Sequence, residues 1–176
     1  MIELVIPDPS LVVLIGAAGA GKSTFAVRHF EPEDILSSDA YRASIAGDES
    51  DQRATGSAFK QLHLALEGRL AKRRLTVVDA TNVERSARRA LLSRAAAADV
   101  PAIAIVLDLP PATILARNAG RTARIVDEPV VRRHLARLRD SLDGLAPVID
   151  GEGFQRVIVI RDPRDLDAVR VSRRRG

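Results

Sequence analysis

The sequence predicts an α/β fold in which a five-stranded parallel sheet is flanked by helices, and three observations support this prediction. Five apolar runs of strand length alternate with longer helical patterns, which is the pattern of parallel βαβ units. The first run, Leu11–Ile15, is continuous and rich in β-branched residues, as a strand buried on both faces requires. The length of 176 residues and the hydrophobic content of 46% suffice for a single domain, 1–176.

Strands and helices are expected in strict alternation. The strands are expected at residues 11–15, 34–37, 75–78, 102–107 and 156–160, with the order 2-3-1-4-5 in the sheet. The helices are expected at residues 22–30, 52–73, 84–98, 111–118 and 129–142. Leucines at 62, 66 and 70, and again at 135, 138 and 142, give two of these helices an apolar stripe. Right-handed crossovers bring the loops after the strands to one rim, where open α/β sheets bind ligands.

The amino-acid composition says more about the cellular compartment of the protein than about its binding partners. The chain has no cysteine, so disulfides and thiolate metal sites are excluded. Neither a secretory signal nor an apolar run of membrane-spanning length is visible, and a cytoplasmic protein is expected. The net charge of +4 would attract polyanions only weakly. The arginine-rich end, Ser172 to Gly176, is interpreted as a domain boundary rather than a phosphate-binding arm.

The loop after the first strand carries the most specific motif. Residues 16–23 fit G-x-x-x-x-G-K-[ST] between a strand and a helix, the context of a phosphate-binding P-loop. Its backbone N–H groups and the helix amino end favour a bound phosphate. Lys22 is expected to reach the β- and γ-phosphates, and Ser23 to bind Mg²⁺ with Thr24 nearby. The expected contacts to a nucleoside triphosphate with magnesium are made by Gly16, Gly19, Ala20, Gly21, Lys22, Ser23 and Thr24.

The loop after the second strand, Leu36 to Arg42, is expected to face an acceptor. Asp39 could take the proton of an attacking hydroxyl, and Arg42, three residues later, could hold a substrate phosphate. An equally open interpretation is structural: Ser37, Ser38 or Asp39 could cap a helix, with Arg42 as a local ion pair.

The third strand ends in Asp79, Ala80, Thr81 and Asn82. Asp79 resembles a Walker-B aspartate that supports magnesium or its waters, or orients the loop beside the acceptor. Thr81 and Asn82 could contact the acceptor, or could cap the helix that begins near Glu84.

Arginines after the fourth strand suggest a lid over residues 117–130. Arg117, Arg121 and Arg124 precede Asp127-Glu128-Pro129, and arginines on a mobile segment can neutralise the γ-phosphate. For any single arginine a solvated helix face is the alternative. The three histidines, His29, His63 and His134, show no ligand spacing and are expected at the surface or in the core.

Taken together, the motifs resemble the kinase domain of bacterial polynucleotide kinase-phosphatase, an RNA-repair enzyme. They are GAAGAGKST, SSDAYR, VVDATN, ARNAGRTAR and VVRRH, and the resemblance extends nearly end to end. It implies a P-loop kinase fold with a helical lid, and transfer of the γ-phosphate of ATP or GTP, with Mg²⁺, to a 5′-hydroxyl end of RNA or DNA.

The resemblance also implies roles for particular residues. Asp39 would be the general base and Arg42 would hold the acceptor phosphate. Arg117 and Arg121 would bind the donor phosphates, and Val130 would contact the terminal nucleobase. Such kinases are usually fused to phosphatase and ligase modules, for which 176 residues leave no room. Either an excised domain or a free-standing relative fits this length.

Two alternatives remain beside the polynucleotide 5′-hydroxyl kinase. A kinase for a small-molecule hydroxyl would share every feature that binds the triphosphate. A non-catalytic nucleotide-binding regulatory module would bind the triphosphate without transferring phosphate, and Asp39 with the lid arginines argues against it. Low aromatic content predicts loose, backbone-led recognition of bases.

Overall fold

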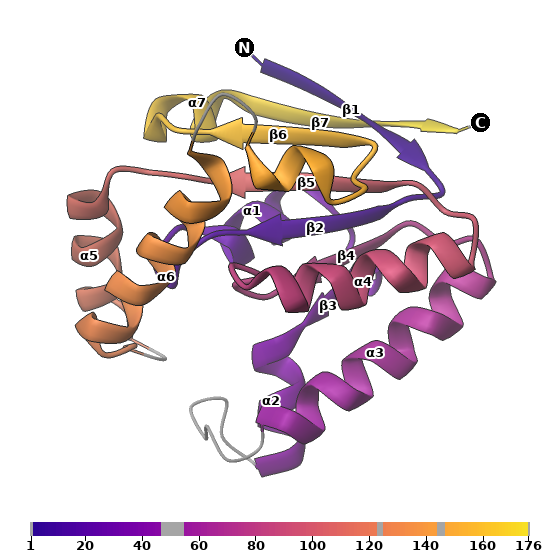
Figure 1. The fold of residues 1–176 in the computed structure, drawn as a ribbon, viewed down its shortest axis with the longest axis horizontal. Coiled ribbons are helices and arrows are strands. Elements are labelled where there is room, and N and C mark those ends of the chain that lie inside the picture. Colours follow the sequence, from indigo (N-terminus) through magenta and orange to yellow (C-terminus); the bar gives the residue numbers. More distant parts are fainter. Residues whose placement is uncertain (1, 47–54, 123–124, 144–146, 176) are drawn as a thin grey trace.

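The computed structural model describes residues 2–46, 55–122, 125–143 and 147–175. Its main sheet is parallel and five-stranded (Figure 1), with the order β3-β4-β2-β5-β6. The strands are β2 (Leu11–Ile15), β3 (Ile35–Ser37), β4 (Thr76–Asp79), β5 (Ala102–Leu107) and β6 (Arg156–Ile160). In chain order this is 2-3-1-4-5, so the predicted fold class and strand order are confirmed.

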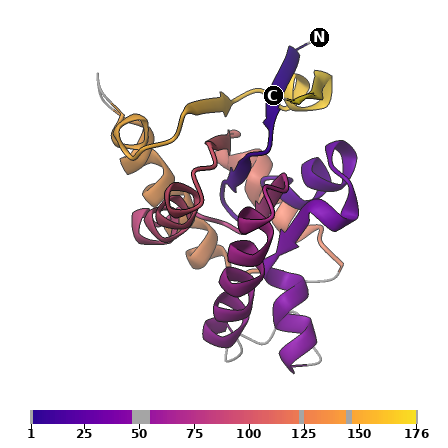
Figure 2. The ribbon, with the colours of Figure 1, turned by 90° about the vertical axis from the view of Figure 1, so that its right-hand side faces the viewer.

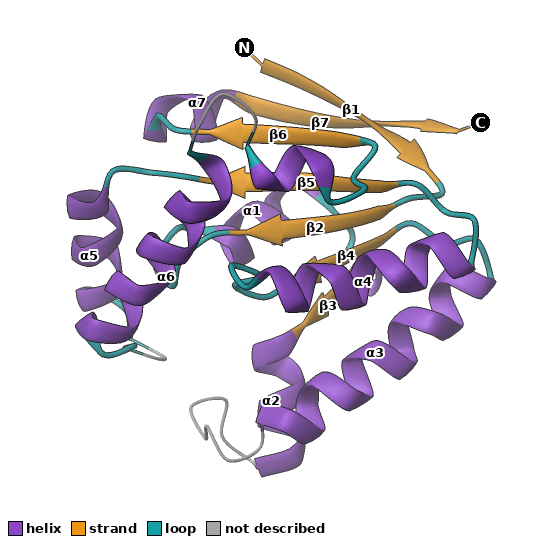
Figure 3. Cartoon of the chain, in the orientation of Figure 1, coloured by secondary structure: helices purple, strands orange, loops and turns teal. Residues whose placement is uncertain are grey.

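Helices cover both faces of the sheet and join successive strands (Figure 3). They are α1 (Lys22–His29), α2 (Ser38–Ala46), α3 (Thr55–Ala71), α4 (Arg85–Ala97), α5 (Pro111–Ala119), α6 (Glu128–Leu142) and α7 (Pro163–Ala168), with short 3₁₀ turns η1 (Pro32–Asp34) and η3 (Val148–Gly151). Each expected helix lies within a few residues of its predicted bounds. The sequence patterns did not indicate α7, and they indicated α2 only as the helix that Ser37, Ser38 or Asp39 could cap.

The alternation of side chains along β2 divides the core into two clusters. Leu11, Val13 and Ile15 pack with α3 and α4, where the predicted leucine stripe of α3 is fully buried. Val12 and Leu14 face the other side and pack with α1 and α5. Because both faces are covered, every side chain of β2 is buried, as the continuous apolar run predicted.

A second, two-stranded parallel sheet was not predicted. It pairs β1 (Ile2–Asp8) with β7 (Val169–Arg175), and Leu4, Ile6 and Val169 bury one face against the core. Figure 2 shows this ribbon at the opposite end of the molecule from α2. The interpretation of residues 172–176 as a domain boundary is therefore wrong for residues 172–175, which belong to β7.

An ion-pair cluster joins the ribbon to the main sheet. Both oxygens of the Asp34 carboxylate are used: Oδ1 accepts from Arg69 Nη2 at 3.0 Å, and Oδ2 accepts from Arg173 Nη2 at 2.6 Å. Asp34 precedes β3, and Arg69 also donates to the Leu75 carbonyl before β4. The arginine-rich end thus stabilises the fold at the edge away from the strand carboxyl ends.

Candidate functional site

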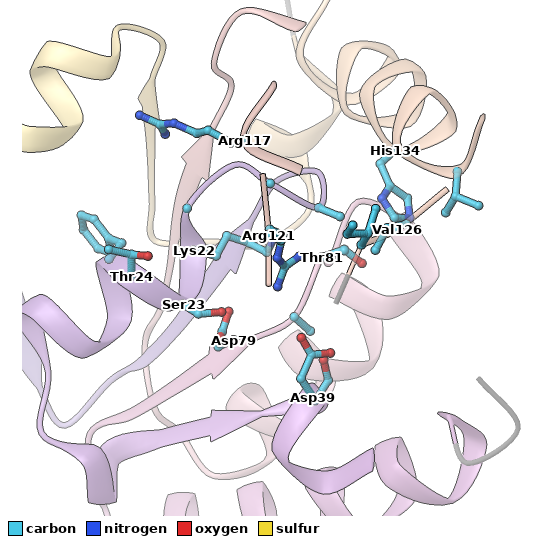
Figure 4. Close-up of a pocket in the computed structure, with 18 of the residues that line it drawn as sticks. Lys22, Ser23, Thr24, Asp39, Asp79, Thr81, Arg117, Arg121, Val126 and His134 are labelled. Atoms are coloured by element: carbon cyan, nitrogen blue, oxygen red, sulfur yellow. The ribbon is translucent and has the colours of Figure 1, made fainter. Parts of the chain in front are cut away.

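A cavity of about 920 Å³ lies at the carboxyl ends of β2, β3 and β4 (Figure 4). The loop after β2 forms one wall, and the other walls come from α2, α3, the lid and α7. The sequence argument placed the polar motifs on this rim, and most of them meet here. Gly16, Ala20 and Asn82 are the predicted site residues that do not line the cavity.

The P-loop has the backbone that its glycines predict. Gly19 and Gly21 adopt φ angles of 89° and 96°, in the left-handed region that glycine tolerates best. A Cβ on Gly19 would lie 2.7 Å from the Ile114 carbonyl oxygen of α5, so this loop packs directly on the lid's first helix. Gly16 supports the loop from below, since its N–H donates to the Thr81 carbonyl at 2.9 Å.

Lys22 begins α1 and is almost completely buried. Its Nζ donates to the carbonyls of Gly16 and Ala17, both at 2.9 Å. Burial lowers the pKa of Lys22 to about 8, opposed by the nearby Asp79 carboxylate and reinforced by the Arg121 guanidinium. Phosphate oxygens would be stronger acceptors than these carbonyls, because the hydrogen bonds would join opposite charges.

The donor set beside Lys22 fits magnesium. Ser23 and the buried Asp79 both line the cavity, and Figure 4 shows their side chains close together beneath Lys22. Mg²⁺ prefers oxygen ligands and is usually held by one or two carboxylates together with substrate phosphates. Among the described residues no cluster of three or more acidic or histidine side chains could hold a metal alone. A magnesium site here would therefore need the phosphates.

Asp39 and Arg42 lie on the α2 wall, across the cavity from the P-loop. They form an ion pair, with 28% of the Asp39 side chain and 7% of the Arg42 side chain exposed. The Ser37 hydroxyl accepts from the Ala40 N–H at 3.4 Å and so caps α2. The structural interpretation is therefore correct in two respects: Ser37 caps the helix, and Arg42 forms a local ion pair with Asp39. Asp39 and Arg42 nevertheless both line the cavity.

Two predicted residues of the loop after β4 have different roles: one lines the cavity, and the other holds the loop in place. Thr81 lines the cavity. Asn82 was predicted to contact substrate or to cap α4, and the structure gives it neither place. It is 3% exposed, and its Nδ2 donates to the Leu14 carbonyl at 2.8 Å, which ties the loop to β2. Glu84 is the N-cap residue of α4, and its side chain accepts no capping hydrogen bond from the helix.

Arg88 of α4 holds this loop from behind. It is fully buried and bonds both oxygens of Glu152, at 2.7 and 2.6 Å. It also donates to the Asn82 and Val83 carbonyls and to the Ser141 hydroxyl. A buried arginine with its donors satisfied in this way rigidifies its surroundings, so the loop after β4, the end of α6 and η3 form one unit.

The two lid arginines in the described chain occupy different places. Arg121 faces Lys22 in the cavity, whereas Arg117 lines another side of the cavity and its guanidinium points away from Arg121 (Figure 4). Arg117 Nη1 lies 3.6 Å from the position of a Cβ on Gly21, at the side of the P-loop where Leu166 also packs. Arg124 lies outside the described residues. Val130, in the first turn of α6, lines the cavity, and its contact with a terminal nucleobase stays a prediction.

Several cavity residues were not identified from the sequence. His134, expected at the surface or in the core, lines the cavity one helical turn after Val130, and Arg133 lies beside it. The i, i+4 spacing of Val130 and His134 could have placed both on one face. Ser38, Thr55 and Phe59 from α2 and α3, and Leu166 and Asp167 from α7, complete the walls. Only tertiary packing brings α3 and α7 here, so no local pattern indicated them.

The fold and the P-loop together define the class of protein. A family model described as an AAA domain, AAA_33, matches residues 11–145, and the chain belongs to this family. The matched residues include the P-loop, the Asp39 and Asp79 loops and the lid, so the family covers the whole cavity except α7.

Solved structures agree on a kinase-like P-loop fold. A putative kinase from Chloroflexus aurantiacus superposes with a TM-score of 0.64 at 15% identity, covering 92% of this chain and 91% of that one. A chain of the Pnkp1/Rnl/Hen1 RNA repair complex gives 0.65 at 22%, covering 76% and 45%. A gluconokinase from Sinorhizobium meliloti gives 0.55 at 19%, covering 93% and 88%. No curated protein matches the chain in sequence.

The present chain thus spans less than half of the RNA repair chain that it matches, but most of the other two. All three likenesses are below 25% identity and concern the fold. Among the described helices, none combines the length and the apolar character needed to cross a membrane.

Proposed function

We propose that this protein is a polynucleotide 5′-hydroxyl kinase, which transfers the γ-phosphate of ATP or GTP to the 5′-hydroxyl end of an RNA or DNA strand. One observation carries the proposal: a carboxylate and arginine pair, Asp39 and Arg42, faces the P-loop lysine across a single cavity. A phosphotransferase needs a proton acceptor and an acceptor-binding group at that position.

The cavity divides into two halves by the residues that line it. The donor half consists of the P-loop with Phe25, Arg28, Arg117, Leu166 and Asp167. The acceptor half consists of side chains from α2, α3, the lid and α6, namely Ser38, Asp39, Arg42, Thr55, Phe59, Ile125, Val126, Asp127, Val130, Arg133 and His134. Arg121, Asp79 and Thr81 lie between them, where the γ-phosphate would be transferred.

In the proposed reaction the acceptor's 5′ oxygen attacks the γ-phosphorus and its proton passes to the Asp39 carboxylate. The bond from the γ-phosphorus to the β,γ-bridging oxygen breaks, which leaves a nucleoside diphosphate and a 5′-phosphorylated strand. Lys22 and Arg121 would stabilise the negative charge on the transferring group. Magnesium, held by Ser23, Asp79 and the phosphates, would neutralise charge and orient the phosphates.

Arg42 would bind the phosphate that follows the terminal nucleoside, which keeps the hydroxyl close to Asp39. Its ion pair with Asp39 serves this role, because the same guanidinium can contact a carboxylate and a phosphate. Arg133 adds an exposed cation to the acceptor half. These arginines suit a polyanionic strand, and the RNA repair chain among the structural neighbours agrees with this substrate class.

A second candidate is a kinase for a small anionic hydroxy compound. It is favoured by one observation: the gluconokinase and another sugar kinase match this chain over nearly their whole length. Asp39 and Arg42 would then bind a sugar acid instead of a strand, while the donor half would act unchanged.

Transfer of label from γ-labelled ATP in the presence of magnesium tests the proposal. The acceptors are a short 5′-hydroxyl oligonucleotide, the same oligonucleotide already 5′-phosphorylated, and gluconate. We expect the parent protein to label only the first, and Asp39→Ala to label none. The KM for the oligonucleotide should rise steeply with salt, since phosphate contacts release counterions. Labelling of gluconate alone, with little salt dependence, would establish the second candidate.

A further inference from the structure

The wall of the acceptor half contains an aromatic ring that the proposed reaction does not use. Phe59 lies one turn into α3, beside Thr55, on the same cavity as Asp39 and Arg42. Helices α2 and α3 pack along each other, so the wall that carries this ring adjoins the wall that carries Asp39 and Arg42.

Phe59 is held in place on its inner side. It packs against the core cluster that includes Leu62 and Leu66 while remaining partly exposed. Its ring centroid lies 6.2 Å from that of His63, one turn later, at an interplanar angle of 55°. Burial and the Arg94 charge lower the pKa of His63, so the imidazole packs as a neutral ring near pH 7. The inner side of the Phe59 ring is therefore supported by the core and by His63, while its outer side faces the cavity.

Exposed aromatic surface is scarce in this molecule. The other three phenylalanines, Phe25, Phe30 and Phe154, are between 3% and 8% exposed. Tyr41 is partly buried and does not line the cavity. Among the residues that the structure describes, Phe59 is thus the phenylalanine or tyrosine ring with exposed surface in the acceptor half, and the imidazole of His134 is the other ring that lines it.

The other residues that line the acceptor half suit one nucleotide of a strand. The lid contributes the apolar side chains of Ile125, Val126 and Val130, and Ile125 is 63% exposed. Arg42 and Arg133 supply positive charge in the same half. Aromatic rings for bases combined with cations for phosphates are the usual means of binding single strands, and every base offers a flat π-face to such a ring.

We infer that Phe59 is the stacking platform for the 5′-terminal base of the acceptor strand. The inference rests on the proposed function and extends it by naming the part of the acceptor that is recognised. Stacking on Phe59 would hold the terminal nucleoside while Arg42 holds the following phosphate, and the 5′-hydroxyl would then face Asp39. The platform would accept any of the four bases, because stacking does not read hydrogen-bonding edges.

Steady-state kinetics with two matched acceptors tests the inference. Both are 5′-hydroxyl oligonucleotides of identical sequence, and one lacks the base of its 5′-terminal nucleotide. We expect Phe59→Leu to raise the KM for the complete acceptor by about 5- to 100-fold. The KM for the abasic acceptor should not change, since it has no base to lose. Phe59→Trp should retain the preference for the complete acceptor.

Leu64→Ala is the matched control, because Leu64 is 60% exposed on the same helix and does not line the cavity. Thermal melting of each variant reports on folding. An equal rise of KM for both acceptors, or no rise for either, would overturn the role of Phe59. Failure of the unsubstituted protein to label either oligonucleotide would instead reject the proposed function, and this result is seen before any substitution is made.

Discussion

The donor half of the cavity is built around one continuous segment, the P-loop, whereas the acceptor half consists of side chains from three separate helices and the lid. Residues 16–24 form the phosphate loop, and its shape follows from glycines at fixed positions. Asp39, Phe59 and His134 come from α2, α3 and α6 and meet only in the folded chain. The phosphate loop of the donor half is thus determined locally, whereas the acceptor half depends on packing between distant elements.

This difference suggests how the two halves can vary. A backbone loop offers every triphosphate the same N–H groups, so it can remain unchanged while the substrate changes. Side chains on separate helices can be replaced one at a time without disturbing the loop. Substitutions in the two halves should therefore affect different kinetic constants, and the predictions below test this separation.

Asp39→Asn should have the largest effect on transfer. The amide keeps the shape of the side chain but cannot accept the proton, and a general base contributes about 10²- to 10⁴-fold to a rate. We expect the transfer rate to fall by at least about 10²-fold while the Kd for ATP, measured by calorimetry, stays within about twofold.

The control for this substitution is Glu67→Gln, which removes the carboxylate of an Arg94 ion pair on α3 outside the cavity. It should leave both constants unchanged. A loss of ATP affinity in Asp39→Asn comparable to its loss of rate would show that the two halves are not separable.

The two lid arginines should differ in a second test. Arg121 faces Lys22 and the point of transfer, and removal of one group that stabilises developing charge costs about 10²- to 10³-fold in rate. Arg117 lies beside Gly21 at the donor side. We expect Arg121→Ala to lower kcat by about this factor, and Arg117→Ala to act mainly by raising the KM for ATP, by about tenfold.

Steady-state kinetics with ATP as the varied substrate separates these effects. Arg132→Ala is the control, since Arg132 is on α6 beyond the cavity and pairs with Glu128 at the surface. A larger kcat loss in Arg117→Ala than in Arg121→Ala would reverse the assignment.

The contrast between local and long-range structure also explains which parts of the molecule could be predicted from the sequence. The five strands, their order and the P-loop were predicted because apolar runs and glycine spacing are local signals. The β1–β7 ribbon was missed because its pairing joins Ile2 to Val169, and among its described side chains only Leu4, Ile6 and Val169 are buried. Asn82 was misplaced because an amide after a strand can cap, bind or support, and its bond to Leu14 depends on the fold.

Gly19→Ala tests whether the loop backbone alone maintains the donor half. Alanine at φ 89° is strained, and its Cβ would lie 2.7 Å from the Ile114 carbonyl oxygen. We expect the free energy of unfolding to fall by about 2 kcal/mol or more, together with a weaker affinity for ATP.

Gly68→Ala is the opposite control. Gly68 lies inside α3 with open space around its Cα, so alanine should raise the free energy of unfolding by about 0.5–1 kcal/mol. Denaturant unfolding of both variants measures the difference. Equal stability of the two would indicate that the loop can relax away from α5.

Because Lys22 is buried, the free energy of unfolding should depend on pH. Its pKa is lowered to about 8 in the folded chain against 10.5 for an ordinary lysine, so the folded state binds fewer protons between these values. Stability rises with pH wherever the unfolded state binds more protons. The penalty of burying the charge is therefore fully present below pH 8 and is lost as the pH rises toward 10.5. Relative to Lys22→Met, the parent should gain about 2–3 kcal/mol of unfolding free energy between pH 7 and pH 10.

Urea unfolding of both proteins at several pH values measures this gain, and the exposed Lys72→Met serves as the control with no pH-dependent difference. A bound triphosphate should abolish the effect, because phosphate charges beside Lys22 favour its protonated form and raise its pKa again. ATP binding above pH 8 should then be accompanied by proton uptake, which calorimetry in buffers of different ionisation enthalpy detects. A pH-independent difference between parent and Lys22→Met would mean that Lys22 leaves the Gly16 and Ala17 carbonyls and reaches solvent when the loop is empty.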